Sequence, residues 1–362
     1  MDWNTRPMRI LDLEGTHAEM GAAFGEHCRG EIETFYRLRV ANALKQAKQH
    51  ADRDVTEAQL LDVARACIEP TRAYHPDGWA ELEGVARGAS MSPEQILAMN
   101  GLTDLRDVLA WHGDLEAFGG CSSVVVGADA SGGHGLCGQT WDLATDNMPY
   151  VLVVRRRPSE GPSTRSLTTV GCLSLIGMND AGIAVGTTNL RTTDPRAGVT
   201  YLSIIHRVLH SHSLEDATAA VTSARRAGAH YYYLMDRHSD AVAIECSAEH
   251  AEVQPARQGI FVHTNHCLVP RHAEIEANTP AASSHARQGR LEQLMRDRLG
   301  DIDASAIESA FADRENGENA INRVDFNGIS SNGAVVMEPA TGAFRACHGT
   351  PHDAEWVDVA EA

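Results

Sequence analysis

The sequence changes character near residue 115, and this change limits the folds that the chain can adopt. Before that point, apolar residues recur at helical spacings with charged residues between them. In the stretch 17–48 they are Met20, Phe24, Ile32, Phe35, Leu38 and Val40. The stretches 55–68 and 79–85 continue the pattern, and Ser92-Pro93 is typical of a helix start, with Ser at the cap and Pro in the first turn. The first third is therefore predicted to be helical.

After Gly120, short β-branched and apolar runs indicate strands. They lie at 122–126, 136–143, 150–154, 166–176, 182–188, 231–236, 241–245 and 259–263, with a closing hairpin over 333–346. Helices are predicted between them at 202–210, 213–227 and 284–299. This order has no regular alternation of strand and helix, so it favours antiparallel sheets covered by helices, an α+β fold.

The composition is that of an ordinary globular protein and argues against a nucleic-acid partner. Hydrophobic residues make up 43% and charged residues 22% of 362 residues. The formal net charge of −18 does not suit binding to phosphate backbones. The one short basic run, Arg155 to Arg157, follows an apolar strand and is interpreted as a solvated strand end. Since no linker or repeat is visible, we expect residues 121–362 to form one domain with the helical part packed on it.

Targeting and membrane signals are not visible in the sequence. The start has an early acid, Asp2, and no long apolar core, which argues against a secretory leader. No run of 18 apolar residues is present, so no membrane span is expected. The eight cysteines are scattered and form no C-x-x-C pair. A reduced, cytoplasmic location is therefore expected.

Two motifs that suggest a cofactor or a metal are set aside. The stretch 133–138 matches G-x-G-x-x-G, but the strand-like stretch 139–143 follows where a dinucleotide site needs a helix. His263 and His266 have no second cluster of ligands at a recognisable spacing. We therefore expect neither a cofactor nor a metal.

The Gly120-Cys121 pair lies where the helical pattern ends and a strand-like pattern begins, and it is the strongest indication of catalytic chemistry in the sequence. A thiol can attack the carbonyl of its own preceding peptide, and glycine there removes the obstruction of a Cβ atom. Cleavage would free the α-amine of Cys121, whose pKa near 8 suits it to take the proton of a thiol with a pKa of about 8.5. Autocleavage between Gly120 and Cys121 is therefore predicted, and the other seven cysteines are interpreted as structural.

Five blocks of sequence resemble the acyl-coenzyme A:6-aminopenicillanate acyltransferase family, which consists of cysteine N-terminal-nucleophile enzymes and includes β-alanyl-amine hydrolases. They are GCSS at 120–123, GQTWD at 138–142, GIAVGTTNL at 182–190, HTNH at 263–266 and NAINR at 319–323. The blocks occur in the family's order, whereas the N-terminal helical part shares only its general helical pattern with the family. The last block departs from the more usual I-C-R.

The resemblance implies roles for four residues. Cys121 resembles the nucleophile, and Asp142 the carboxylate that positions the nucleophile and its amine. Asn265 resembles the side-chain donor of the oxyanion hole. Arg323 resembles the arginine that pairs with the active-site carboxylate.

The resemblance also implies a fold and an activity. The fold is a four-layer αββα sandwich of antiparallel sheets, and cleavage would give associated chains of residues 1–120 and 121–362. The expected activity is hydrolysis of a small-molecule amide or acyl-amine through a thioester. The alternatives are an acyl-coenzyme A-dependent N-acyltransferase and a non-catalytic binding protein on the same fold. Hydrolysis is preferred because the sequence has no basic patch for the phosphates of coenzyme A. Neither the substrate's two halves nor the oligomeric state can be inferred from the sequence.

Overall fold

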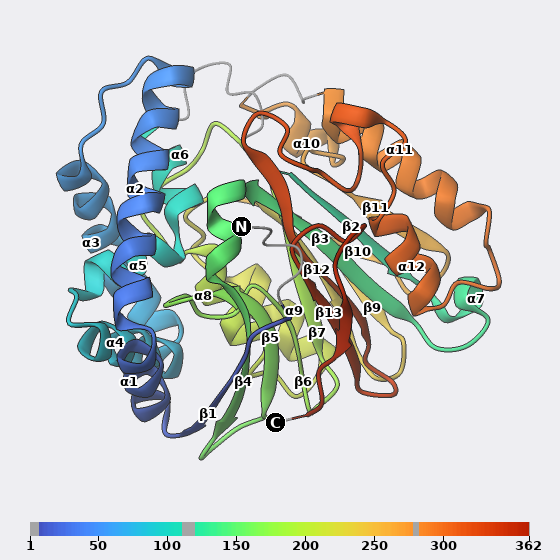
Figure 1. Cartoon of the computed structure of the whole chain (residues 1–362), viewed down its shortest axis with the longest axis horizontal. Helices are drawn as coiled ribbons and strands as arrows, with labels where there is room; N and C mark the ends of the chain where they lie inside the picture. The colour runs from blue at the N-terminus through green and yellow to red at the C-terminus, as the bar shows by residue number, and fades with distance from the viewer. Residues whose placement is uncertain (1–6, 111–119, 278–281, 362) are drawn as a thin grey trace.

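Two β-sheets lie face to face between layers of helices in the computed structural model, which describes residues 7–110, 120–277 and 282–361 (Figure 1). The eight-stranded sheet has the order β1 (Ile10–Gly15), β4 (Val151–Pro158), β5 (Thr164–Thr169), β6 (Ile176–Asn179), β7 (Ala184–Asn189), β8 (His230–Met235), β9 (Ala241–Cys246) and β10 (Ala251–Pro255). The six-stranded sheet has the order β11 (Ile260–His263), β2 (Gly120–Val126), β3 (Leu136–Ala144), β12 (Ile329–Glu338), β13 (Ala343–His348) and β14 (Trp356–Asp358). The two sheets touch where β2 and β3 contact β7.

Helices cover the outer face of each sheet. On the eight-stranded sheet, α8 (Tyr201–Val208) contacts β7, and α9 (Leu214–Ser223) contacts β8 and β9. The N-terminal helices pack on this side as well: α1 (His17–His27), α2 (Arg29–Ala51), α3 (Glu57–Tyr74), α4 (Pro76–Ala89), α5 (Pro93–Asn100) and α6 (Leu102–Ala110). On the six-stranded sheet lie α11 (Ala282–Arg296), against β2 and β11, and α12 (Ala304–Phe311), against β3 and β12. The predicted four-layer α+β sandwich is thus confirmed.

Strand β1 ties the N-terminal part to the eight-stranded sheet. It pairs with β4 in parallel, from Ile10 opposite Val153 to Gly15 opposite Pro158, while the other strand pairs are antiparallel in the part of the chain that the structure describes. The expectation of a purely helical segment before residue 120 was wrong on this point. The residues before Cys121 therefore supply an edge strand as well as a helical layer.

Helices α1 and α4 cross at very short range because glycines replace side chains at their contact. A Cβ atom on Gly21 would lie 2.0 Å from the carbonyl oxygen of Glu81, and one on Gly88 would lie 2.2 Å from that of Ala22. No real Cβ atom approaches a backbone oxygen so closely. The two helices can pack in this way only while these positions lack a side chain.

Several local predictions can be compared with the structure directly. The hydroxyl of Ser92 caps α5, as expected. The predicted helix over 17–48 is two helices that meet at Cys28. The arginine run was not a solvated strand end as a whole, because Arg156 is fully buried against Glu81. The G-x-G-x-x-G stretch leads into β3 and not into a helix. In the described residues, no helix is both long and apolar enough to cross a bilayer.

Candidate active site

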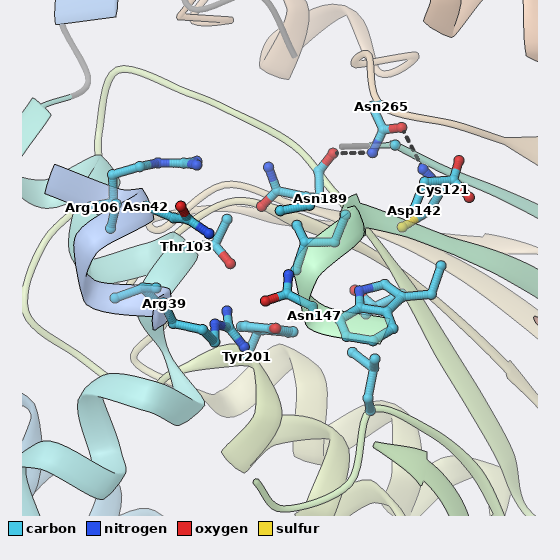
Figure 2. Close-up of a pocket in the computed structure, with 18 of the residues that line it drawn as sticks. Arg39, Asn42, Thr103, Arg106, Cys121, Asp142, Asn147, Asn189, Tyr201 and Asn265 are labelled. Atoms are coloured by element: carbon cyan, nitrogen blue, oxygen red, sulfur yellow. Dashed lines mark hydrogen bonds between the residues drawn. The ribbon is translucent and has the colours of Figure 1, made fainter. Parts of the chain in front are cut away.

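Three of the four predicted site residues meet at one cavity (Figure 2). Cys121 is the second residue of β2, and the β2–β3 register places Asp142 opposite the preceding residue, Gly120. On the other side of β2, β11 ends at His263, opposite Ser123, so the chain reaches Asn265 at the same end of the sheet. Cys121, Asp142 and Asn265 all line the cavity, as Gly120 does.

Side chains hold both polar backbone atoms of Cys121. Its N–H donates to Asn265 Oδ1 over 2.9 Å, and its carbonyl oxygen accepts from Arg287 Nη1 over 2.6 Å. Arg287 Nη2 also donates to Asn265 Oδ1 over 2.9 Å. Asn265 in turn donates from Nδ2 to the carbonyl oxygen of Asn189 over 3.0 Å. The start of β2 is therefore fixed by contacts with polar side chains.

Arg287, on α11, was not predicted from the sequence. It is fully buried, and its Nε also donates to Ser283 Oγ, one helical turn earlier. Burial lowers the pKa of Arg287 to about 10, although the carboxylate of Asp142 acts in the opposite direction. Because α11 carries several arginines in a similar pattern, nothing in the local sequence distinguishes this one.

Asp142 is buried in a site that leaves one of its oxygens free. Ser331 Oγ donates to Asp142 Oδ1 over 2.7 Å, whereas Oδ2 has no hydrogen-bond partner among the described residues. Burial raises the pKa of Asp142, and the positive charges of Arg287 and Arg323 oppose that rise. The free oxygen can accept a proton or a hydrogen bond from a neighbouring group.

Arg323 reaches Asp142 through an intermediate. Its backbone N–H donates to Ser331 Oγ over 3.0 Å, and Ser331 donates on to Asp142. Its guanidinium donates to Ser283 Oγ over 2.8 Å. Arg323 does not line the cavity in the described part of the chain. Its link with the carboxylate is therefore electrostatic and indirect, while Arg287 is the arginine that touches Cys121 and Asn265.

The thiol of Cys121 is protonated at neutral pH in this environment. Burial, followed by the nearby charge of Asp142, raises the pKa of Cys121 to about 12, with Arg287 and Arg323 acting against the rise. The nucleophilic form of cysteine is the thiolate. This cysteine therefore needs a base beside it before it can attack a carbonyl.

The cavity extends from Cys121 along an apolar wall to a basic end. Trp141, Leu143 and Leu175 contribute apolar surface to the cavity wall. Arg39 and Arg106, from α2 and α6, lie on the opposite side in Figure 2, and Arg191, after β7, lines the same cavity. The absence of a basic patch in the sequence was thus misleading, because folding brings together arginines that are far apart along the chain.

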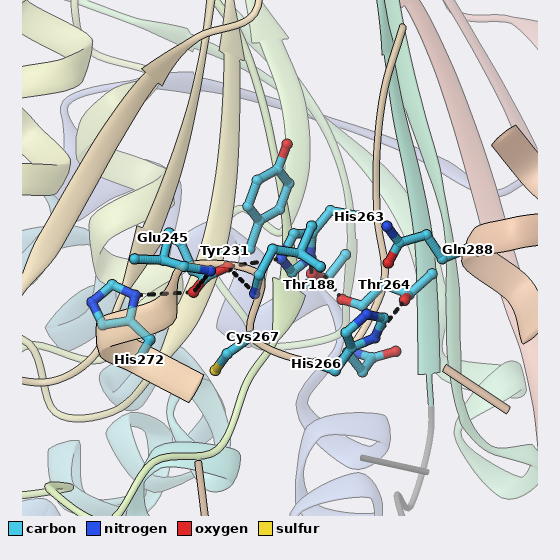
Figure 3. Close-up of polar contacts among 12 residues, drawn as sticks. Thr188, Tyr231, Glu245, His263, Thr264, His266, Cys267, His272 and Gln288 are labelled. Carbon is cyan, nitrogen blue, oxygen red and sulfur yellow. Dashed lines mark hydrogen bonds and ion pairs between the residues drawn. The ribbon is translucent and has the colours of Figure 1, made fainter. Parts of the chain in front are cut away.

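The two histidines of the HTNH block are held by protein groups (Figure 3). His263 forms hydrogen bonds with Glu245 Oε2 at 3.3 Å and Thr188 Oγ1 at 2.9 Å, and His266 forms one with Ser284 Oγ at 2.8 Å. Within the described ranges, the group with metal-ligand spacing is a different one, His17, His206 and His210, whose ligand atoms lie within 4.8 Å of one another. That group does not line the Cys121 cavity.

Known proteins resemble this chain over most of its length. Residues 130–351 match the family model described as acyl-coenzyme A:6-aminopenicillanic acid acyl-transferase, a range that begins after Cys121 and contains Asp142, Asn265 and Arg323. The acyl-coenzyme A:6-aminopenicillanic-acid-acyltransferase 40 kDa form of Emericella nidulans is 26% identical over 292 residues, which cover 80% of this chain and 77% of the relative.

Two solved structures are similar to part of this chain. A variant of conjugated bile acid hydrolase from Clostridium perfringens has a TM-score of 0.48 and 13% identity, covering 66% of this chain and 92% of its own. Penicillin V acylase from Agrobacterium tumefaciens has a TM-score of 0.43 and 14% identity, covering 66% of this chain and 86% of its own.

Proposed function

The chain belongs to the acyl-coenzyme A:6-aminopenicillanic acid acyl-transferase family, and from this we propose that it is a self-processing cysteine amidohydrolase. It would cleave a linear amide through an acyl-thioester on Cys121. One observation carries the proposal. The backbone nitrogen of Cys121, which cleavage would turn into an α-amine, is bound by Asn265 at a cavity that Asp142 also lines.

Self-processing would begin with attack of the Cys121 thiol on the carbonyl carbon of Gly120. The peptide C–N bond breaks as a thioester forms, the nitrogen of Cys121 takes the thiol proton, and water then releases the carboxyl group of Gly120 and restores the thiol. The packing supports glycine at this position, because a Cβ atom on Gly120 would lie 2.9 Å from Arg287 Nη2. A larger residue would displace the arginine that holds the carbonyl oxygen of Cys121.

In turnover, the free α-amine would serve as the base that the buried thiol needs. The amine takes the thiol proton, and the thiolate attacks the substrate carbonyl. The amine then protonates the leaving nitrogen, and water resolves the thioester to free acid. For the oxyanion donor we propose Asn265, which lines the cavity. Its Nδ2 would exchange the carbonyl oxygen of Asn189 for the substrate oxygen.

The two products of cleavage, residues 1–120 and 121–362, are expected to stay associated. Strand β1 pairs with β4 over its whole length, and buried side chains from α1 to α5 belong to the same hydrophobic core as those of the eight-stranded sheet. Separating the chains would expose this apolar surface to water, which is unfavourable.

Acyl transfer to an amine is the second candidate. It is favoured by the name of the Emericella nidulans relative and by the arginines in the cavity, which suit an anionic donor. Both reactions pass through the same thioester. Measuring free acid against new amide from one acyl donor, with and without an added amine, separates the two. A non-catalytic protein would give neither product.

The decisive test is the intact mass of purified wild-type protein and of Cys121→Ala. The wild type should give two chains, one of which begins with Cys121, and should hydrolyse acyl-amines. The Cys121→Ala variant should remain a single species of 39.1 kDa without activity. Cys137→Ala, at a buried cysteine on the neighbouring strand, is the matched control and should be processed normally. An uncut wild-type protein that hydrolyses amides would disprove the proposal.

A further inference from the structure

The end of the cavity away from Cys121 is lined by arginines, and no described aspartate or glutamate lines that end. Arg39, Arg106 and Arg191 line it. Among the described lining residues, Asp142 is the sole carboxylate, and it lies beside Cys121. Figure 2 shows Arg39 and Arg106 on the helices that face Cys121 and Asp142 across the cavity. The two ends of the cavity therefore differ sharply in charge.

The acid behind this wall is shared by two of the three arginines. Arg106 Nη2 donates to Asp107 Oδ1 over 2.8 Å, and Arg191 Nε lies 3.4 Å from the same oxygen. Arg191 nevertheless has all three of its side-chain nitrogens buried without a hydrogen-bond partner in the described structure, and burial lowers the pKa of Arg191. The carboxylate of Asp107 is thus the shared counter-charge of Arg106 and Arg191, and it forms a hydrogen bond only with Arg106.

Arg39 has no acidic partner at all within the described ranges. Arg39 is only 7% exposed, and its guanidinium carbon lies 5.5 Å from the centre of the Phe35 ring. Asp104, on α6, is already used by His230 and by the backbone N–H of Tyr201, and Asp146 accepts from Asn42. A buried cation without a counter-charge is unfavourable, so a wall of this kind is expected where a ligand supplies the missing charge.

We propose that this end of the cavity binds a carboxylate, so that the substrate is an amide whose acyl or amine part carries a carboxylate away from the scissile bond. A planar guanidinium group can donate two parallel hydrogen bonds to one carboxylate, and three arginines line this cavity. Asn147 also lines the cavity, and its Oδ1 is buried without a hydrogen-bond partner among the described residues, so it suits an N–H or O–H of the same ligand. This substrate class rests on the proposed amidohydrolase function.

The test uses pairs of substrates that differ in one charge. Glutaryl-4-nitroanilide carries the carboxylate on the acyl part, and its terminal carboxamide is the neutral partner. Phenylacetylglycine carries the carboxylate on the amine part, and phenylacetylglycinamide is its neutral partner. The wild type should prefer the charged member of at least one pair by about 30-fold or more in kcat/KM. The pair that shows the preference identifies which half of the substrate reaches the arginines.

Arg39→Met should abolish that preference, because kcat/KM for the charged member of the pair should fall to the level of its neutral partner. Arg37→Met is the matched control, because Arg37 lies two residues away on the same helix with its side chain 75% exposed and paired with Glu33. This control should keep the preference. Equal rates for charged and neutral substrates in active wild-type protein would overturn the inference and leave the proposed function intact.

A binding measurement separates this inference from the proposed function. Glutarate, which has no amide to cleave, should raise the melting temperature of the wild type and of Arg37→Met, but not that of Arg39→Met. If glutarate binds in this Arg39-dependent way while no amide is hydrolysed, the carboxylate site stands and the amidohydrolase proposal fails. If glutarate has no effect on the wild type, the inference fails.

Discussion

The guanidinium of Arg287 joins three acceptors at the start of β2. It donates to the carbonyl oxygen of Cys121, to Ser122 Oγ and to Asn265 Oδ1. These acceptors lie in a buried or partly buried site, and each one left unsatisfied by the loss of Arg287 would cost about 1–3 kcal/mol. Asn265 Oδ1 would keep the hydrogen bond from the backbone N–H of Cys121. Arg287 is therefore expected to act as a positioning residue for Cys121, the proposed nucleophile, and for Asn265.

Replacing Arg287 with Met should lower kcat/KM by about 100-fold or more, because Cys121 and Asn265 lose a shared anchor. Autocleavage should slow as well, which the rate of appearance of the two chains on a gel would show. Arg290→Met is the matched control on the same helix, since Arg290 pairs with Asp313 away from the cavity. Normal processing in Arg287→Met would refute the positioning role. Arg287→Lys separates charge from geometry and should restore activity only weakly.

The charge of Asp142 is expected to govern the titration of the Cys121 thiol. The carboxylate raises the pKa of Cys121, so Asp142→Asn should make the thiol ionise at lower pH while autocleavage and turnover are lost. Site-resolved iodoacetamide labelling across a pH series measures this shift. Asp146→Asn, at an exposed acid four residues on, should leave the labelling profile unchanged. An unshifted profile in Asp142→Asn would contradict this electrostatic role.

At the residue scale, the site residues that could be predicted are those that lie within recognisable sequence motifs. Cys121, Asp142 and Asn265 were predicted from blocks of sequence, and all three line one cavity. Arg287 and Arg39 were not predicted, because each is a single arginine on a helix with other arginines. Their importance comes from burial and from what lies opposite them, and neither property can be inferred from one sequence.

At the element scale, apolar periodicity predicted most of the secondary structure, but not its interruptions. The helical pattern runs through Cys28, where α1 ends and α2 begins. Strand β1 was not predicted, although apolar and polar residues alternate from Leu11 to Glu14. The alternation is only four residues long, and only Leu13 in the strand is buried. Its place in the sheet follows from pairing with β4, a contact between distant parts of the chain.

The crossing of α1 and α4 gives a direct test of packing between elements. Gly21→Ala should destabilise the protein by about 1–3 kcal/mol, because the new methyl group would overlap the backbone of Glu81. Gly30→Ala, at an exposed position of α2 with no atom within 4 Å of the added Cβ, should be neutral or stabilising by about 0.5 kcal/mol. Urea unfolding of both variants provides the measurement. Equal stability of the two would mean that α1 and α4 are not in close contact.

At the scale of the whole molecule, a buried polar cluster joins the N-terminal helices to the eight-stranded sheet. Glu81 on α4 pairs with Arg156 on β4 and lies 3.3 Å from His206 on α8. The rings of His75 and His210 pack against His206, with centroids 5.4 Å and 4.7 Å away. Burial lowers the pKa of all three histidines, that of His210 to about 3, so they stay neutral in the folded protein.

This cluster predicts that stability falls on mild acidification. Below a pH of about 6.5 the unfolded chain binds protons on these histidines while the folded chain does not, so the free energy of unfolding decreases as the pH decreases. For His210 alone the loss at pH 5 is about 2 kcal/mol relative to neutral pH. Glu81, whose pKa is lowered by the charge of Arg156 against the effect of burial, contributes to acid lability only below its ordinary pKa of 4.5.

Urea unfolding between pH 7.5 and 5 therefore measures the histidines before the carboxylate titrates. His210→Gln keeps a polar group in place and removes one proton-binding site of the unfolded chain, so its stability should depend less steeply on pH than that of the wild type, whatever its stability at pH 7.5. His238→Gln, at an exposed histidine, should retain the wild-type slope. If the wild-type protein were equally stable at pH 7.5 and 5, these histidines would gain protons in the folded protein. The cluster would then not be the neutral one described above.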